Sequence, residues 1–355
     1  MKHNYFENRK KKFKVEIKNK FAKQIPKNAL VELTNACNHA CIFCYNPEMK
    51  RSISSIDIDV FKSFISKGVT EGLEEVGLYS TGEPFMTKNL DQFIKISKDN
   101  GLKRVYITSN GALANLSKVK KALEAGLDSI KFSINAGSKE TYKIIHGHDD
   151  FAKVINNLQD IYHYKKKNKI KLQLLCSFVF TDLTKKEIES FKKKYQKYFD
   201  EDIRFVKAAN QGGHTKARSE ILTNKIDHQF NNHKDSNLEK KFKPCSMLWD
   251  RLHLTSEGNL TACCVDYEND LVYKKFSEEE KIIDQFNSEK ITNLRDKHLK
   301  NELKNTICHN CIFNENAKYR KIDEKIMPSK KQTNNFESAK VKLLKSRINQ
   351  FVKKV

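Results

Sequence analysis

The chain has 355 residues, of which 38% are hydrophobic and 31% are charged, a balance that suits a globular protein with a buried core and a strongly hydrated surface. Its net charge of +23 comes mainly from lysines dispersed along the chain, which is typical of a solvated surface and makes nucleic acid an unexpected partner. No apolar run is long enough to cross a bilayer, and the basic start lacks the apolar segment of a secretion signal, so we expect a cytoplasmic protein without a membrane partner.

Residues 1–26 are basic and carry no core pattern, so we interpret them as an N-terminal extension. From residue 27 to residue 224, short apolar runs alternate with longer segments of helical period. The predicted strands are Ala29–Thr34, Val76–Ser80, Arg104–Thr108, Ser129–Ile134, Lys171–Phe180 and Ile203–Ala208. Strict alternation favours parallel strands with right-handed crossovers, so the fold class is α/β, and six units predict a partial (β/α)6 TIM-like barrel.

Beyond the barrel, residues 225–243 are polar and are predicted to form a linker. A small second module is predicted over 244–314, which contains five of the nine cysteines. The basic tail, 315–355, has an apolar period that predicts a terminal helix, at Val341, Leu344, Ile348 and Val352. Because a cytosolic protein keeps its cysteines reduced, clustered cysteines indicate metal binding or catalysis before disulfides.

Three cysteines follow the first predicted strand in C-x3-C-x2-C spacing: Cys37, Cys41 and Cys44. A 4Fe-4S cluster is normally held by four thiolates, so three thiolates leave one iron open. Structural zinc is the alternative, but it needs four ligands and no fourth cysteine is local; we interpret His39 as a neutral surface histidine. The position at the C-terminal end of a strand, where barrels carry their chemistry, favours the cluster.

Polar residues follow the next predicted strands as well. They are Thr81, Gly82 and Glu83 after the second strand, Asn110 after the third, and Ser133 and Asn135 at the end of the fourth. Glycine lets the backbone approach a ligand closely, and strand alternation places Ser133 and Asn135 on the same side, toward the barrel interior. A glycine turn at 210–213 follows the sixth strand at the same rim and is expected to lie over the adenine or the substrate.

The Cys37/Cys41/Cys44 loop resembles the signature of the radical S-adenosylmethionine (SAM) superfamily. The resemblance implies that SAM chelates the open iron and is cleaved by one electron to methionine and a 5′-deoxyadenosyl radical, which abstracts hydrogen from a substrate. Thr81-Gly82-Glu83 is similar to the family's Gly-Gly-Glu motif, with threonine in place of the first glycine, and His146 stands where relatives often carry arginine. The resemblance implies SAM contacts at Phe43, Tyr45, Thr81, Gly82, Glu83, Asn110, Ser133 and Asn135.

The cysteines of the second module are similar in spacing to the shortened SPASM module, often called twitch, in which four cysteines hold one auxiliary 4Fe-4S cluster. The spacing from Gly258 favours Cys263 over its neighbour Cys264 as a ligand. The expected ligands are therefore Cys245, Cys263, Cys308 and Cys311. A zinc ribbon is the alternative, because it uses the same thiolates. Arg251 and His253 lie in a predicted strand of this module and are candidates to face the active site.

A closed auxiliary cluster can accept an electron, so the simplest reaction is a two-electron oxidation such as alcohol to ketone. Within the family, single-cluster modules resemble those of aminocyclitol and sugar-modifying dehydrogenases, which implies an oxidoreductase acting on a small sugar-like or anionic substrate. It also implies an external electron donor such as flavodoxin or ferredoxin. One alternative is radical SAM modification of a peptide or protein. The other is a non-enzymatic zinc-binding, nucleic-acid-associated protein.

Overall fold

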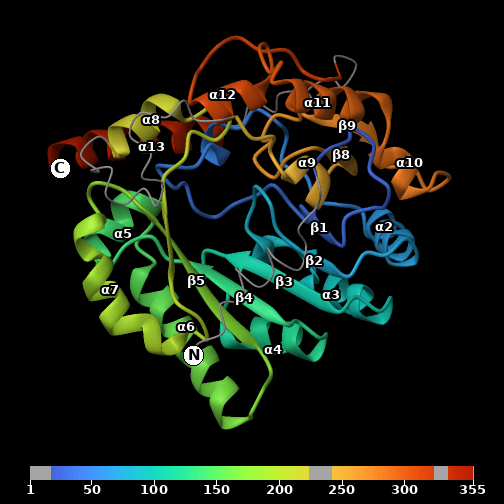
Figure 1. The fold of residues 1–355 in the computed structure, drawn as a ribbon. Coiled ribbons are helices and arrows are strands. Elements are labelled where there is room, and N and C mark those ends of the chain that lie inside the picture. The colour runs from blue at the N-terminus through green and yellow to red at the C-terminus, as the bar shows by residue number, and fades with distance from the viewer. Residues whose placement is uncertain (1–16, 224–241, 324–334, 355) are drawn as a thin grey trace.

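The computed structural model describes residues 17–223, 242–323 and 335–354 (Figure 1). Most of the predicted linker lies outside these residues. Strands β1 to β6 follow one another in the sheet, every neighbouring pair is parallel, and the predicted six-unit partial barrel is confirmed. They are β1 (Asn28–Val31), β2 (Glu75–Gly77), β3 (Arg104–Ser109), β4 (Ser129–Ser133), β5 (Gln173–Phe180) and β6 (Arg204–Lys207).

Helices connect the barrel strands and cover one face of the sheet. These helices are α2 (Ile58–Thr70), α3 (Leu90–Asp99), α4 (Leu116–Glu124), α5 (Lys139–His146), α6 (Phe151–Lys167) and α7 (Ile188–Tyr195), whereas α8 (Lys216–Leu222) follows β6. Short 3-10 turns lie at η1 (Asn46–Glu48), η2 (Pro84–Met86), η3 (Lys185–Glu187) and η4 (Gln196–Tyr198). Helix α2 illustrates the local cause: the Asp57 carboxylate accepts the N–H groups of Asp59 and Val60 and so caps its first turn.

The second module extends the barrel sheet, which the sequence did not predict. It contains α9 (Met247–Asp250), β7 (Leu252–Leu254), β8 (Asn259–Thr261), β9 (Val272–Lys275), α10 (Ile282–Phe286), α11 (Glu289–Lys300) and α12 (Ile307–Phe313). Strand β7 pairs in parallel with β1, and β8 and β9 continue antiparallel, which gives one nine-stranded sheet. Because β1 would otherwise expose unpaired backbone groups at an edge, β7 satisfies them.

The faces of the strands alternate as expected for a barrel wall. On β4, Ile130 and Phe132 lie in the main hydrophobic core with the helices, which leaves Lys131 and Ser133 on the interior face. Strands β1 and β2 end at Val31 and Gly77, earlier than predicted, because the residues beyond them leave the sheet and form the loops of the site.

The ends of the described chain pack against the two modules. The Trp249 indole N–H donates to the Asn19 carbonyl at 2.8 Å, so the described part of the N-terminal extension lies against the second module. The C-terminal helix α13 (Asn335–Lys354) contacts η1 and α5. Its buried apolar side chains include Leu344 and Phe351, whereas Val352, which the periodicity placed on the same face, is 56% exposed. Figure 1 shows α8, α12 and α13 gathered on the side of the strands away from α4 and α6.

No helix among the described residues is both long and apolar enough to span a bilayer.

Candidate active site

The loop with the first three cysteines runs from the end of β1 to η1 and has no helix or strand of its own. Burial, together with the charges of Glu83 and Cys44, raises the pKa of the Cys37 thiol to about 12. The pKa of Cys41 is raised by burial and by the charges of Cys44 and Cys37. The three thiols are therefore close neighbours in a desolvated place. Such a set suits a positively charged iron centre, which stabilises thiolates.

Gly82 and Glu83 hold this loop from the end of β2. A Cβ at Gly82 would lie 2.6 Å from the Ala36 carbonyl oxygen and closer still to that of Thr34, so only glycine fits against this backbone. The Glu83 N–H donates to the Ala36 carbonyl at 2.8 Å. These contacts place the Glu83 carboxylate next to the cysteine loop.

The Glu83 carboxylate is 2% exposed and accepts three hydrogen bonds. Its donors are the Ser109 hydroxyl at 2.7 Å, the Asn110 N–H at 2.8 Å and the Phe85 N–H at 3.1 Å. Burial raises its pKa to about 7, and the hydrogen bonds from Asn110 and Ser109 oppose that rise. A carboxylate in this position can bind a cationic amino group, as the resemblance to the Gly-Gly-Glu motif implies.

Thr81, which replaces a glycine of that motif, is engaged by protein groups. Its hydroxyl donates to Glu32, and its carbonyl accepts the Asn46 amide at 2.9 Å. Glu32 forms a buried ion pair with Arg51, whose Nη2 lies 3.0 Å from the nearer carboxylate oxygen. The Arg51 Nε also donates to the Tyr267 carbonyl at 2.8 Å. The pair was missed from the sequence, because no local spacing connects its members.

Asn110, Ser133 and Asn135 come together near the same rim, but their side chains are largely committed within the protein. The Asn110 amide donates to Asn38 at 2.8 Å. The Asn135 side-chain oxygen accepts the Val179 N–H at 2.8 Å, and its nitrogen lies 3.2 Å from the Ser133 hydroxyl. Their expected SAM contacts remain predictions. The 210–213 turn packs against α12, because the Asn210 amide donates to the Asn310 carbonyl at 2.9 Å.

The aromatic residues beside the cysteines lie on opposite sides of the loop. Phe43 packs with the small hydrophobic cluster that includes Leu344 of α13. Tyr45 stacks on His214, with 4.3 Å between ring centroids, and meets Tyr267 edge to face. The loop is therefore enclosed by the C-terminal helix on one side and by the second module on the other.

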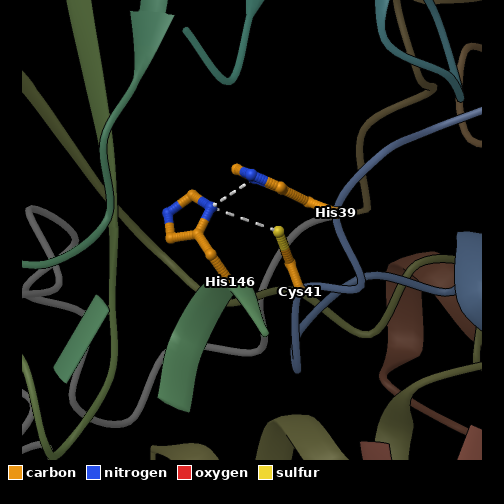
Figure 2. A group of neighbouring side chains, drawn as sticks. All are labelled: His39, Cys41 and His146. Carbon is orange, nitrogen blue, oxygen red and sulfur yellow. Dashed lines mark hydrogen bonds between the residues drawn. The ribbon is translucent and has the colours of Figure 1, made fainter. Parts of the chain in front are cut away.

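His39 was predicted to be a neutral surface histidine, and its surface placement is wrong. It is 1% exposed, because it packs between Tyr142, His146 and His148. Burial lowers its pKa to about 4, although Asp150 opposes that shift. Figure 2 shows the His146 ring directed toward both His39 and the sulfur of Cys41. His146 itself is fully buried, and its Nδ1 lies 3.5 Å from Cys41 Sγ.

The four cysteines expected at the auxiliary cluster line one apolar cavity: Cys245, Cys263, Cys308 and Cys311. Burial raises the pKa of the Cys308 thiol, followed by the charges of Cys245 and Cys311. His298 lines the same cavity and is fully buried. Its Nδ1 accepts the Cys245 N–H at 3.4 Å, so the proton sits on Nε2, which has no partner among the described residues.

This arrangement fits a closed iron–sulfur cluster, since it offers four sulfurs in one cavity and a buried N–H donor for an inorganic sulfide. Cys264 is not among the residues that line the cavity, but it lies close to it: its sulfur is 3.9 Å from that of Met247, a lining residue, and its charge raises the pKa of Cys245 and of Cys311. The choice of Cys263 over Cys264 as ligand stays a prediction. His253 is 2% exposed, and on β7 it lies opposite the core-facing Leu252 and Leu254. Within the described residues, neither of its ring nitrogens makes a hydrogen bond of standard geometry, although the ring lies close enough to Cys264 to lower the pKa of that thiol.

Comparison with known families defines the class of protein. Residues 31–194 match the model of the radical SAM superfamily, and residues 245–312 match that of the SPASM iron–sulfur cluster-binding domain. Together the two matches span more than half of the chain. The chain therefore belongs to the radical SAM superfamily and is a radical SAM enzyme with a C-terminal SPASM domain, which works with SAM, a 4Fe-4S cluster and an auxiliary iron–sulfur cluster. The alternative of a non-enzymatic zinc-binding protein does not agree with this membership.

Among curated proteins, the chain is similar to several relatives over part of its length. It is 33% identical over 130 residues to a probable GTP 3′,8-cyclase of Sulfurisphaera tokodaii, covering 37% of this chain and 41% of that protein. It is 30% identical over 179 residues to a probable GTP 3′,8-cyclase of Metallosphaera sedula, covering 49% of this chain and 51% of that protein. The chain thus spans about half or less of these relatives' length.

Solved structures share the fold over a larger part of the chain. BtrN in complex with AdoMet and 2-DOIA aligns with a TM-score of 0.51 at 17% identity, covering 84% of this chain and 98% of BtrN. The enzyme anSMEcpe with bound AdoMet aligns with a TM-score of 0.55 at 14% identity, covering 93% and 98%. Streptococcus suis SuiB bound to precursor peptide SuiA aligns with a TM-score of 0.56 at 13% identity, covering 81% and 69%. These identities indicate a common fold.

Proposed function

We propose that this enzyme oxidises a sugar, an aminocyclitol or a similar polyol by two electrons. The SAM cluster is held by Cys37, Cys41 and Cys44, and the auxiliary cluster by Cys245, Cys263, Cys308 and Cys311. The observation that carries the proposal is the single cavity lined by the four cysteines of the second module. It has ligands for one closed cluster, and a closed cluster serves as an electron acceptor and not as a second site for SAM.

The chemistry of a two-electron alcohol oxidation matches what the two centres supply. With SAM and its cluster bound, the loop of Cys37, Cys41 and Cys44 would supply hydrogen-atom abstraction from carbon, and a cluster held by the four cysteines of the second module would accept the remaining electron. The protein must also bind the substrate and receive the hydroxyl proton. Glu83 and the backbone that it fixes orient SAM, since the buried carboxylate lies beside the cysteine loop.

Polar groups without partners line the barrel interior and are suited to hydroxyl groups. Among the described residues, the Thr108 hydroxyl on β3 and both ring nitrogens of His253 on β7 are buried and have no hydrogen-bond partner. A hydroxyl both donates and accepts, so it satisfies either group. A neutral imidazole is also able to receive the hydroxyl proton, and we propose His253 for that role.

The test is an anaerobic reaction of the reconstituted enzyme with SAM, a reductant and a panel of sugars and aminocyclitols. We expect formation of 5′-deoxyadenosine and a product that lacks two hydrogen atoms. Deuterium on the reacting carbon should appear in 5′-deoxyadenosine. Replacement of Cys263 by Ser should abolish the oxidised product while SAM cleavage persists, whereas Cys264→Ser should retain both. If the enzyme cleaves SAM but oxidises none of the polyols, the proposal is contradicted.

Modification of a peptide is the second candidate, because SuiB is bound to precursor peptide SuiA in its structure and its fold resembles this chain. A peptide panel in the same assay separates the two functions. A mass change on a peptide, with no change in any polyol, would favour the second candidate.

A further inference from the structure

Two of the three sulfurs in the first cysteine loop lie within hydrogen-bond distance of buried side chains. The Nδ1 of His146, at the end of α5, lies 3.5 Å from Cys41 Sγ. The hydroxyl of Tyr267, in the second module, lies 3.4 Å from Cys44 Sγ. Both side chains are well removed from solvent, with 0% and 6% exposure, so water does not compete for either contact.

The direction of the histidine contact follows from the opposite side of its ring. The backbone N–H of Asn135 donates to His146 Nε2 at 3.4 Å, so Nε2 carries a lone pair and no proton. In a neutral imidazole the proton then sits on Nδ1, the nitrogen that faces Cys41. A cysteine that ligates iron is a thiolate and can only accept, so the N–H of His146 donates to the sulfur.

His39 offers a second acceptor for the same N–H group. Its Nδ1 lies 3.3 Å from His146 Nδ1, and its Nε2 lies 3.2 Å from the Asp150 carboxylate. Because the Asp150 carboxylate accepts the Nε2 proton, the His39 Nδ1 is left as an acceptor. The N–H of His146 is shared between a neutral nitrogen and a thiolate, and the charge of the thiolate makes it the stronger acceptor.

The tyrosine contact connects the two cysteine sites. The Tyr267 hydroxyl lies 3.4 Å from Cys44 Sγ, and because an iron-bound thiolate can only accept, the hydroxyl is the donor in this contact. Arg51 fixes the Tyr267 backbone through the 2.8 Å bond to its carbonyl. Tyr267 follows Cys263 by four residues, so the side chain that contacts the first loop belongs to the loop that carries an auxiliary ligand.

We propose that His146 and Tyr267 donate hydrogen bonds to the ligand sulfurs of Cys41 and Cys44 and thereby raise the reduction potential of the SAM cluster. A donor at a ligand sulfur stabilises the more negative, reduced cluster, so it eases reduction by an external donor. Through Tyr267 the SPASM module adjusts the cluster of the barrel. The inference rests on the assignment of the three cysteines as ligands and is independent of the substrate.

The test is the midpoint potential of the SAM cluster in the holoenzyme, measured by an EPR-monitored redox titration of the SAM-sensitive signal. Tyr267→Phe removes only one hydroxyl, and His146→Leu removes the imidazole donor. For each we expect about a tenfold lower ratio of reduced to oxidised cluster at fixed potential, which is about 59 mV for a one-electron couple. His146→Asn places an amide N–H near the former Nδ1, so we expect it to restore much of the potential.

Two matched controls separate the sulfur contacts from general effects. Tyr319→Phe removes a hydroxyl that donates at 2.8 Å to Asp270, a residue of the second module. His148→Leu removes an exposed imidazole that stacks on His39 at 5.4 Å between centroids. Neither should shift the potential.

A potential for Tyr267→Phe equal to that of Tyr319→Phe, at equal iron and sulfide content, would overturn the proposal. If His146→Leu loses iron, Tyr267→Phe decides the matter, because it deletes one oxygen atom and no ligand. A wrong substrate class leaves these potentials unchanged, so failure of the proposed function is distinguishable. If the wild-type protein shows no SAM-sensitive EPR signal, the assignment of Cys37, Cys41 and Cys44 as cluster ligands is wrong, and the proposal falls with it.

Discussion

The buried ion pair between Arg51 and Glu32 links three parts of the site, so its removal has a calculable cost. Arg51 is 1% exposed and donates to Glu32, to the Tyr267 carbonyl at 2.8 Å and to Asn269 at 3.2 Å. The substitution Arg51→Met keeps most of the apolar stem and removes the charge. It leaves Glu32 buried without its counter-charge.

Breaking one side of a buried ion pair costs about 3–5 kcal/mol, because the remaining charge has lost both water and its partner. In a large domain 1 kcal/mol shifts the unfolding temperature by about 2–4 °C, so Arg51→Met should lower it by at least about 6 °C. The matched control is Lys95→Met, which breaks a surface pair with Asp99 whose side chains are 67% and 58% exposed. An exposed pair contributes less than about 1 kcal/mol.

The assay is anaerobic thermal unfolding of both variants with their clusters in place. Burial tends to raise the pKa of Glu32, but Arg51 and the hydrogen bonds from Thr81 and Ser256 lower it overall. A carboxyl with a lowered pKa stabilises the folded state above its unfolded pKa, and that stability is lost as the pH falls through the folded pKa. The penalty of Arg51→Met should therefore shrink in acid. Equal unfolding temperatures for the two variants at neutral pH would refute this reasoning.

Three further predictions concern the binding loops. Gly82→Ala should cost about 1–3 kcal/mol and lower the iron bound at the first loop, because the new methyl group meets backbone carbonyls. The control is Gly68→Ala, whose methyl group meets side-chain atoms of Leu73 and Ile282 and no backbone; equal iron content in the two variants would contradict the prediction. The affinity for SAM, measured by anaerobic calorimetry, should rise with pH and level off above about 7, as the Glu83 carboxyl ionises. Glu83→Gln should weaken SAM binding and remove its dependence on pH. If the variant keeps the pH profile of the wild type, Glu83 does not contact SAM. His298→Phe leaves the Cys245 N–H buried without an acceptor and should destabilise the auxiliary site by about 1–3 kcal/mol. The expected observation is that half of the iron is lost to a chelator faster than from the wild type. If the variant retains its iron as the wild type does, His298 does not stabilise the auxiliary site.

The sequence predicted the barrel well because its evidence is local. Each barrel strand is a short apolar run, and parallel strands bring their C-terminal ends to one rim, so motifs separated by dozens of residues were expected to meet. The approach of Gly82 to the Cys37 loop agrees with that expectation. A strand around Arg251 and His253 was expected in the second module, but its pairing with β1 was not, because that pairing joins residues more than 200 positions apart and no local pattern indicates it.

Side-chain environments could not be predicted for a related reason. His39 sits in a polar loop, and nothing nearby in the sequence indicates that Tyr142, His146 and His148 will surround it. The departure at His146, where relatives often carry arginine, was visible in the sequence. Its meaning depends on the contact with Cys41, 105 residues away in the chain.

The C-terminal helix gives the clearest case of a segment whose role is visible only in three dimensions. The cysteine loop pairs with the end of α5, since the Ala40 N–H donates to the His146 carbonyl at 3.1 Å. Arg347 of α13 is 4% exposed and donates to the Ala40 carbonyl at 2.6 Å. A Cβ at Gly147 would overlap this guanidinium, so the glycine makes room for it.

Lys340 of the same helix adds a hydrogen bond to the Cys37 carbonyl at 2.9 Å. A loop with no regular structure leaves some of its carbonyls without an internal partner, and a buried carbonyl left unpaired costs about 1–3 kcal/mol. The lysine-rich tail, which on charge alone is typical of a solvated surface, therefore supplies two of the donors that hold the loop of the three partly buried thiols in place.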